Sequence, residues 1–255
     1  MTQSRLWGYA SDPVLIAHRG GGQEAPENSR QAFSRLNDLG LSHIETDVHS
    51  TKDSVAVVIH DPILDRVSDG HGRVSQYTWD ELRRYRDHSG QPLMRLDEAL
   101  DEFSHLVFNI DAKENRVIEP LISAIKHTGA QKRVSLASFS ERRLVQLRQK
   151  LPGVSSSMGI SAVAKLIAAA NVPGSLRSAI LRLLPAADDG VHAVQVPESF
   201  RGIKIVDEKF VELVHSLKMA VHVWTVNDEE HAAQLVDLGV DGIITDIPSA
   251  LRHIV

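Results

Sequence analysis

Short apolar runs alternate with amphipathic stretches along this chain, a pattern that predicts strands alternating with helices. The first predicted helix starts at Pro26–Ser29 and runs to about 39. The other predicted helices lie near 78–85, 96–103, 141–150, 162–170, 176–184, 207–218, 228–238 and 248–254. The predicted strands lie near 14–17, 43–48, 106–113, 134–137, 154–157, 193–196, 221–225 and 242–245. Eight βα units in about 250 residues predict an α/β protein with the (β/α)8 (TIM) barrel fold.

A doubly wound open sheet is the alternative fold, and it is disfavoured because the glycines of His18–Gly22 lack the spacing of a dinucleotide-binding fingerprint. No segment has the composition of a linker. We therefore expect residues 1–255 to form a single barrel domain.

A β-hairpin is predicted where two runs rich in β-branched residues, 43–50 and 55–61, flank the turn Thr51–Ser54. If the turn is centred between Lys52 and Asp53, paired residues have numbers that sum to about 105, which places Glu45 opposite His60. Glu45 and Asp47 are two residues apart and share one face of the strand. A solvent-exposed charged face would explain this pattern, but the flanking apolar residues indicate a buried strand pair that needs a cation. Those flanking residues are Ile44, Val48, Val57 and Ile59.

The segment 62–95 reads as a short, loop-rich insertion after the second strand. Asp61, Asp65 and Asp69 are spaced four apart, whereas an EF-hand calcium loop needs aspartates two apart. We therefore expect these three residues to stabilise turns rather than to bind calcium.

Composition narrows the functional classes. The formal net charge of −5 gives no basic surface for nucleic acid, and the absence of cysteine excludes disulfides, thiolate zinc sites and cysteine nucleophiles. Residues 1–13 show no secretory signal pattern, and no apolar run is long enough to span a bilayer. We expect a soluble cytoplasmic protein, and the sequence predicts no oligomeric state.

In a TIM barrel the functional residues lie at the carboxyl ends of the strands. The first three strands end at His18, at Glu45 with Asp47, and at Asp111 with Lys113. Carboxylate oxygens suit Mg²⁺ or Ca²⁺, Arg19 and Lys113 can neutralise a phosphate, and His18 and His60 can transfer protons. Each residue alone has a structural explanation, such as a histidine that ends a strand or a solvated lysine. Their convergence on neighbouring strand ends favours one shared site for an anionic substrate and a metal.

These residues resemble the glycerophosphodiester phosphodiesterase family over nearly the whole chain. The matching segments are 18–20, 26–29, 45–48, 51–53, 60–61, 109–113, 223–227 and 239–246. The resemblance implies a TIM barrel that hydrolyses a small glycerophosphodiester to sn-glycerol 3-phosphate and an alcohol with a divalent metal. It also implies residue roles: His18 and His60 as the acid/base pair, Glu45, Asp47 and Asp111 as metal ligands, Arg19 and Lys113 as phosphate contacts, and Trp224 as a wall of the substrate pocket. One departure is Asp111, where the family usually has glutamate.

Two other functions compete with this expectation. A phosphodiesterase that resembles lysophospholipase D or sphingomyelinase D would share the core motif but would need an apolar groove beside the site. A non-catalytic phosphodiester-binding barrel would be expected to lack one of the histidines or acids, and none is missing. The apolar segment 162–184, with Arg177 and Arg182, could contact a membrane, but helix packing on the barrel strands explains it better.

Overall fold

The computed structural model describes residues 6–255, which form two compact units. Unit 1 comprises the residues up to Leu15, Ala137–Thr245 and Ala250–Val255, and unit 2 comprises Ile16–Leu136 and Asp246–Ser249. The prediction of a single domain stays a prediction.

Eight strands of the described chain follow one hydrogen-bonded path, in the order β6-β5-β4-β2-β1-β11-β10-β7. The pairings of β1 with β2, β2 with β4, β10 with β11 and β7 with β10 are parallel. A further parallel bridge joins Ser156 of β6 to Val191, just before β7. This order confirms the predicted (β/α)8 fold class. The strands are β1 (Val14–His18), β2 (His43–Ser50), β4 (Val107–Ala112), β5 (Val134–Ala137), β6 (Ser155–Ser156), β7 (Ala193–Pro197), β10 (Ala220–Trp224) and β11 (Gly242–Thr245).

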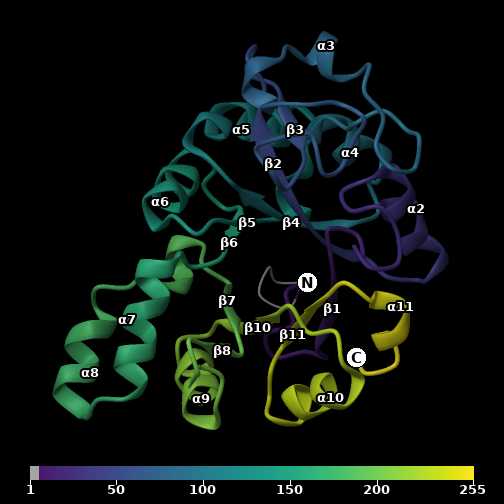
Figure 1. The fold of residues 1–255 in the computed structure, drawn as a ribbon. Coiled ribbons are helices and arrows are strands. Elements are labelled where there is room, and N and C mark those ends of the chain that lie inside the picture. The colour runs from purple at the N-terminus through teal and green to yellow at the C-terminus, as the bar shows by residue number, and fades with distance from the viewer. Residues whose placement is uncertain (1–5) are drawn as a thin grey trace. The chain divides into compact units, whose positions relative to one another are not determined.

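Helices follow the strands, as labelled in Figure 1. Four of them begin directly after a residue whose side chain accepts a hydrogen bond from a backbone N–H of the first turn, which favours helix initiation there. These N-cap residues are Ser29, Ser140, Asp207 and Asp228. The helices are α2 (Arg30–Asp38), α3 (Trp79–Leu82), α4 (Leu96–Glu102), α5 (Ile118–His127), α6 (Glu141–Lys150), α7 (Ile160–Ala170), α8 (Gly174–Leu181), α9 (Glu208–Ser216), α10 (Glu229–Asp237) and α11 (Pro248–Leu251).

The sequence pattern missed one helix and one short hairpin, and it overextended other elements. Helix α5 was not among the predicted helices, although it buries Leu121 and Ile125 on one face. The small hairpin of β8 (Ser199–Phe200) and β9 (Ile203–Lys204) was also missed, because its strands are two residues long and solvent-exposed. Helix α3 spans a single turn rather than 78–85, and β6 is shorter than 154–157.

The predicted hairpin is present as β2 and the antiparallel strand β3 (Ala56–Val58), but its register differs from the prediction. Val48 pairs with Val58 and Ser50 with Ala56, so paired numbers sum to 106 and the turn is centred on Asp53. The ladder ends at Val48, so Glu45 does not lie opposite His60 in it. A shift of one residue exchanges the two faces of a strand, which is why a turn position estimated from sequence is a weak guide to register.

Unit 2 holds the first half of the chain, and its strand β2 is buried on both faces. Ile44, Thr46 and Val48 are fully buried on one face, while Glu45 and Asp47 are buried on the other. Phe33 of α2 packs edge-on against Phe108 of β4, with ring centroids 6.0 Å apart. Both faces of a strand are commonly covered in parallel α/β sheets. The two acids therefore lie in an interior where their charges need partners.

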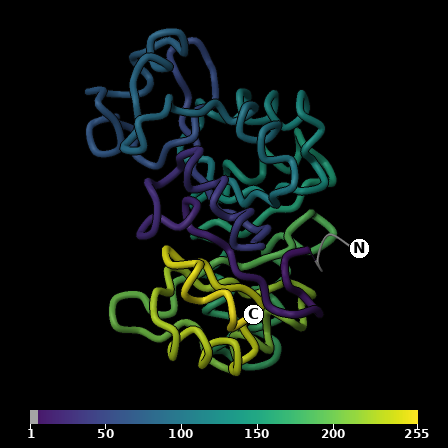
Figure 2. The backbone as a smooth tube through the Cα atoms, turned by 90° about the vertical axis from the view of Figure 1, so that its right-hand side faces the viewer, coloured from purple at the N-terminus to yellow at the C-terminus, as the bar shows by residue number. Residues whose placement is uncertain are grey.

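The insertion at 62–95 is mostly turns, as the blue segment of Figure 2 shows. It nevertheless has a small apolar core on the hairpin, formed by Val57, Ile59, Leu64, Val67, Val74, Leu82 and Leu93. Asp65 accepts a hydrogen bond from the backbone N–H of Gly72 within the loop, whereas Asp69 accepts from the backbone N–H of Arg86 and joins two segments of the insertion. The insertion is thereby fixed to the hairpin that carries His60.

In unit 1, α7 and α8 pack against each other (Figure 1). Helix packing explains α7, which buries Ala162 and Leu166, but α8 buries none of its residues and exposes Leu176. Between residues 6 and 255, no helix has the length and apolarity that a membrane span requires.

Candidate active site

The turn after β1 carries His18 and Arg19. Arg19 has a φ of 53°, in the left-handed region that non-glycine residues rarely adopt, and its N–H donates to Glu45 Oε2 at 3.2 Å. Gly20 and Gly21 also have positive φ, and a Cβ on Gly20 would lie 2.8 Å from that of Ala32. The turn therefore needs glycine at this close approach, and it directs Arg19 toward the acids of β2.

The parallel register brings the predicted ligands together. His18 pairs with Glu45 across β1 and β2, and Asp47 pairs with Asp111 across β2 and β4. His18 Nε2 lies 3.9 Å from Glu45 Oε2. Three adjacent strands thus present an imidazole and three carboxylates within unit 2.

Lys113, just beyond β4, lies between two of these acids. Its Nζ is 2.7 Å from Asp47 Oδ1 and 2.8 Å from Asp111 Oδ2. Arg19 Nε lies 3.4 Å from the other oxygen of Asp47. The second oxygen of Asp111, Oδ1, is buried without a hydrogen-bond partner. Two cations therefore neutralise Asp47, while Asp111 keeps one oxygen available.

Asn28 fixes the orientation of Asp47. Its amide nitrogen donates to Asp47 Oδ2 at 3.1 Å, and its amide oxygen accepts from the Thr46 hydroxyl at 2.7 Å. Asn28 has a φ of 55°, a conformation that asparagine tolerates better than most residues. The sequence analysis placed Asn28 in a family motif but gave it no role.

Each predicted acid/base histidine has a carboxylate on Nδ1. His18 Nδ1 lies 2.7 Å from Asp246 Oδ1, and His60 Nδ1 lies 2.7 Å from Asp61 Oδ1. Asp61 lies in a bend of the chain, and its carboxylate is also the partner of His60, a role that the sequence analysis did not give it. Because a carboxylate only accepts, Nδ1 carries the proton and Nε2 is left for chemistry.

Burial and charge shift the pKa values of this cluster. Burial, then the charge of Asp47, raises the pKa of Glu45 to about 8. Burial acts in the same direction on Asp47, but Lys113, His60 and Arg19 hold the pKa of Asp47 below its usual value. Burial alone would lower the pKa of His18, yet the hydrogen bond to Asp246 and the charge of Glu45 raise it. At Glu45, burial and the charge of Asp47 therefore outweigh the opposing charges of His18 and Lys113.

The fit to a divalent metal is partial. Among residues 6–255, no group of three His, Cys, Asp or Glu side chains has the geometry of a metal cage. Lys113 holds Asp47 and Asp111 in ion pairs instead. The donor chemistry still suits a hard cation, because Glu45, Asp47 and Asp111 offer carboxylate oxygens and Asp111 Oδ1 has no donor.

Trp224, the predicted wall of the substrate pocket, ends β10 in unit 1. Its ring packs edge-on against the exposed ring of Phe139, with centroids 6.1 Å apart. The other predicted site residues belong to unit 2, so the role of Trp224 stays a prediction.

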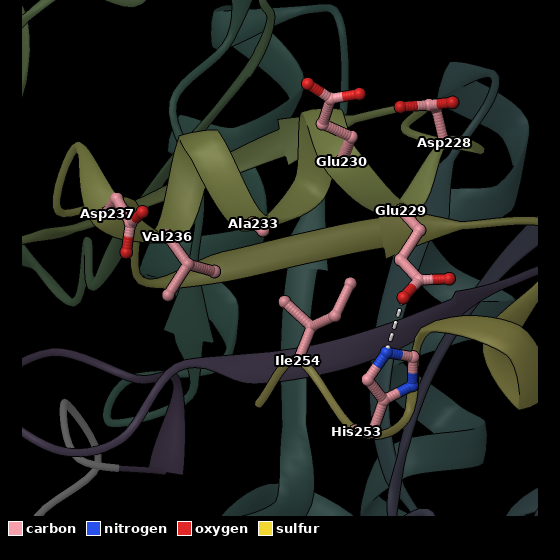
Figure 3. A pocket seen from close by; sticks show the side chains of 8 residues that line it. All are labelled: Asp228, Glu229, Glu230, Ala233, Val236, Asp237, His253 and Ile254. Carbon is pink, nitrogen blue, oxygen red and sulfur yellow. Dashed lines mark hydrogen bonds and ion pairs between the residues drawn. The ribbon is translucent and has the colours of Figure 1, made fainter.

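A pocket of about 630 Å³ lies in unit 1 between α10 and the C-terminal residues (Figure 3). Its charged lining consists of Asp228, Glu229, Glu230 and Asp237 together with His253, which pairs with Glu229 at 2.8 Å. A predominantly acidic lining repels an anionic phosphodiester. This pocket is therefore not the candidate active site.

The sequence analysis gave no role to Asn28, Asp246, Glu27 or Arg66. The first three lay inside or beside quoted motifs, which was the available signal. Arg66 lay in the insertion, and nothing in its local sequence indicated its contacts.

Comparison with known proteins identifies the family of this chain. Residues 18–250 match the Glycerophosphoryl diester phosphodiesterase family. A probable glycerophosphodiester phosphodiesterase 2 of Mycobacterium tuberculosis is 34% identical over 243 residues, covering 94% of this chain and 90% of the relative. A glycerophosphodiester phosphodiesterase of Caldanaerobacter subterraneus is 30% identical over 256 residues, covering 95% of this chain and 97% of the relative.

The solved structure of an Oleispira antarctica phosphodiesterase in complex with the product sn-glycerol-3-phosphate has a TM-score of 0.78. It is 22% identical, and the match covers 95% of this chain and 96% of the other, a likeness that concerns the fold. Because the family matches residues 18–250 and two curated relatives are 34% and 30% identical over most of the chain, this chain belongs to the glycerophosphoryl diester phosphodiesterase family.

Proposed function

We infer that this enzyme hydrolyses water-soluble glycerophosphodiesters to sn-glycerol 3-phosphate and an alcohol. The observation that carries the proposal is the pairing of two histidines with carboxylates, His18 with Asp246 and His60 with Asp61, in the unit that holds the acidic and basic cluster. The curated relatives are named for glycerophosphodiester phosphodiesterase activity. The product bound to the Oleispira antarctica phosphodiesterase supports the same substrate class.

In this mechanism, Arg19 and Lys113 bind the phosphate oxygens and neutralise part of their charge. One histidine removes a proton from the nucleophile through Nε2, and the other donates a proton to the departing alkoxide. The nucleophile is either water or the 2-hydroxyl of the substrate's own glycerol, the latter giving a cyclic phosphate that water then opens. Asp246 and Asp61 keep each imidazole in the tautomer with a proton on Nδ1.

Glu45, Asp47 and Asp111 are the residues that would hold a divalent ion such as Mg²⁺ or Ca²⁺. When bound, such an ion withdraws electron density from the phosphate and stabilises the added charge of the transition state. The oxygen of Asp111 without a donor and the burial of Glu45 beside Asp47 support this assignment. Trp224 is proposed as an apolar wall for the substrate.

The test is an assay of metal-depleted protein on glycerophosphocholine, glycerophosphoethanolamine and lysophosphatidylcholine, with Mg²⁺ or Ca²⁺ restored. We expect sn-glycerol 3-phosphate from the first two substrates only after metal is restored, and a loss of about 10²–10⁴-fold in kcat for His18→Ala and His60→Ala. Turnover of the lysolipid alone would instead identify a lysophospholipase D. No turnover of any substrate, with binding retained, would identify a phosphodiester-binding protein.

A further inference from the structure

Arg66 of the insertion contacts two carboxylates at once. Its Nε donates to Asp61 Oδ2 at 2.6 Å, and its two terminal nitrogens donate to the two oxygens of Glu27 at 2.6 and 2.8 Å. A planar guanidinium is the one side chain that can make a forked pair with one carboxylate and a third hydrogen bond to another. Arg66 therefore connects Asp61, which follows β3, to Glu27, which precedes α2.

Each of these carboxylates also contacts a predicted site residue. Asp61 accepts from His60 Nδ1 at 2.7 Å, and Glu27 accepts from Arg19 Nη1 at 3.2 and 3.3 Å. The Arg66 guanidinium is thus linked through a single carboxylate to the proposed acid/base imidazole of His60, and through another to the proposed phosphate-binding guanidinium of Arg19. The chain of contacts His60–Asp61–Arg66–Glu27–Arg19 lies wholly within unit 2.

The backbone of Arg66 is held by the insertion. Its carbonyl accepts from His88 Nε2 at 2.7 Å, and the neighbouring Val67 and Leu64 belong to the apolar core between the insertion and the hairpin. The Arg66 side chain is 47% exposed, and an isolated exposed ion pair stabilises little. The forked pair with Glu27, the third bond to Asp61 and the anchored backbone make Arg66 more rigid than an isolated ion pair. Its main effect is therefore to fix the orientation of the residues that it contacts.

We propose that Arg66 is a positioning residue that sets the orientation of both the His60 imidazole and the Arg19 guanidinium. This inference rests on the proposed function, and it gives the insertion a role in the reaction. Through Asp61, Arg66 holds the His60 ring in one orientation and tautomer. Through Glu27, it holds the Arg19 guanidinium beside the acids of β2, where Arg19 Nε lies 3.4 Å from Asp47.

Arg66→Gln and Arg66→Lys test the proposal. Glutamine removes the charge and the fork, while lysine keeps the charge but can replace only part of the three bonds. We expect Arg66→Gln to lower kcat and raise KM, with kcat/KM falling on the order of 10- to 100-fold, as when catalytic groups lose their orienting partners. The logarithm of kcat/KM for Arg66→Lys should lie closer to the value for Arg66→Gln than to the value for wild type.

Arg30 provides the matched control. It also bridges two carboxylates of unit 2, Glu98 and Glu102, and its third hydrogen bond goes to the Pro92 carbonyl rather than to a predicted site residue. Arg30→Gln should change kcat/KM by less than about threefold. Equal losses in the Arg30 and Arg66 variants would reduce Arg66 to a general structural role and overturn the proposal.

A second measurement does not depend on turnover. Long-range ¹H–¹⁵N spectra report the tautomer of His60, which should be uniformly protonated on Nδ1 in wild type and mixed in Arg66→Gln. A His60 tautomer unchanged in that variant, or kcat/KM within threefold of wild type, overturns the proposal. If wild type hydrolyses no glycerophosphodiester, the proposed function fails, and the spectra still decide whether Arg66 orients His60.

Discussion

Nδ1 of His18 lies 2.7 Å from Oδ1 of Asp246, although the two residues are 228 positions apart in the sequence. His18 ends β1 and Asp246 follows β11, which are neighbours in the strand order. His60 has a carboxylate at the same distance, but its partner Asp61 is the next residue. The two imidazoles are therefore oriented in the same way by one distant and one adjacent aspartate.

Asp246→Asn should reduce kcat by about 10-fold or more with little change in KM. The amide is neutral and can donate to Nδ1, so it no longer fixes the tautomer that leaves Nε2 for proton transfer. Steady-state kinetics on glycerophosphocholine measures the effect. The control is Glu229→Gln, which alters the exposed pair with His253 at 2.8 Å and should leave kcat unchanged. Wild-type kcat in Asp246→Asn would remove Asp246 from the mechanism.

Lys113→Met should destabilise the protein as well as inactivate it. Lys113 pairs with Asp47, whose side chain is 2% exposed, and with Asp111. Removal of one partner from a buried ion pair commonly costs about 3–5 kcal/mol, because the remaining charge is left uncompensated. Urea unfolding in the absence of metal measures this loss.

Lys113→Met with Asp47→Asn should recover part of the lost free energy of unfolding, because the double variant removes one of the uncompensated charges. Divalent metal should stabilise Lys113→Met more than wild type, since binding to the native state adds stability by mass action. Equal free energies of unfolding for wild type and Lys113→Met would show that the pair contributes no net stability.

Much of the fold follows from local sequence. The apolar runs of β1, β2, β4 and β5 are each bounded by polar or turn-forming residues, so their positions could be predicted within a few residues. Helix starts were predictable where an N-cap side chain was present, as at Asp207 and Asp228. The short hairpin of β8 and β9 has no apolar periodicity, because its residues are exposed, and so it gave no signal.

The strand-end residues of the candidate site were predictable because a barrel places strand termini together. Their partners were not. The pairing of Lys113 with Asp47 depends on side-chain rotamers, and that of His18 with Asp246 depends on which strands are neighbours. The hairpin register depends on the turn conformation, where Ser54 has a positive φ. These features come from tertiary structure and leave no periodic trace in the sequence.

Glu24→Gln should lower stability in a pH-dependent way. Glu24 accepts hydrogen bonds from the Ser249 hydroxyl at 2.5 Å and from Arg35. Burial alone would raise the pKa of Glu24, but these bonds lower it. A lowered folded-state pKa contributes stability that is present above the unfolded pKa of about 4.3 and is lost as pH falls through the folded value.

Urea unfolding at several pH values measures this contribution. The difference in the free energy of unfolding between wild type and Glu24→Gln should be largest above about pH 5 and should shrink as the pH falls below about 4. The exposed Glu212 of α9 is the control, and Glu212→Gln should follow the wild-type pH dependence. A difference between wild type and Glu24→Gln that is constant with pH would mean that the charge of Glu24 adds nothing.

Asp111 stands where the family resemblance implied glutamate, and the charge of its carboxylate should matter more than its length. Aspartate is one methylene shorter than glutamate, which retracts the carboxylate by about 1.5 Å. Asp111 Oδ1 is nevertheless buried without a donor beside Asp47, and it is therefore the oxygen with most to gain from a cation. Asp111→Asn should raise the Mg²⁺ or Ca²⁺ concentration needed for half-maximal activity by about 10-fold or more, while Asp111→Glu keeps measurable turnover. Metal titration of activity and of the melting temperature measures both, with the exposed Asp80→Asn as control. An unchanged metal requirement in Asp111→Asn would show that Asp111 serves only to hold Lys113.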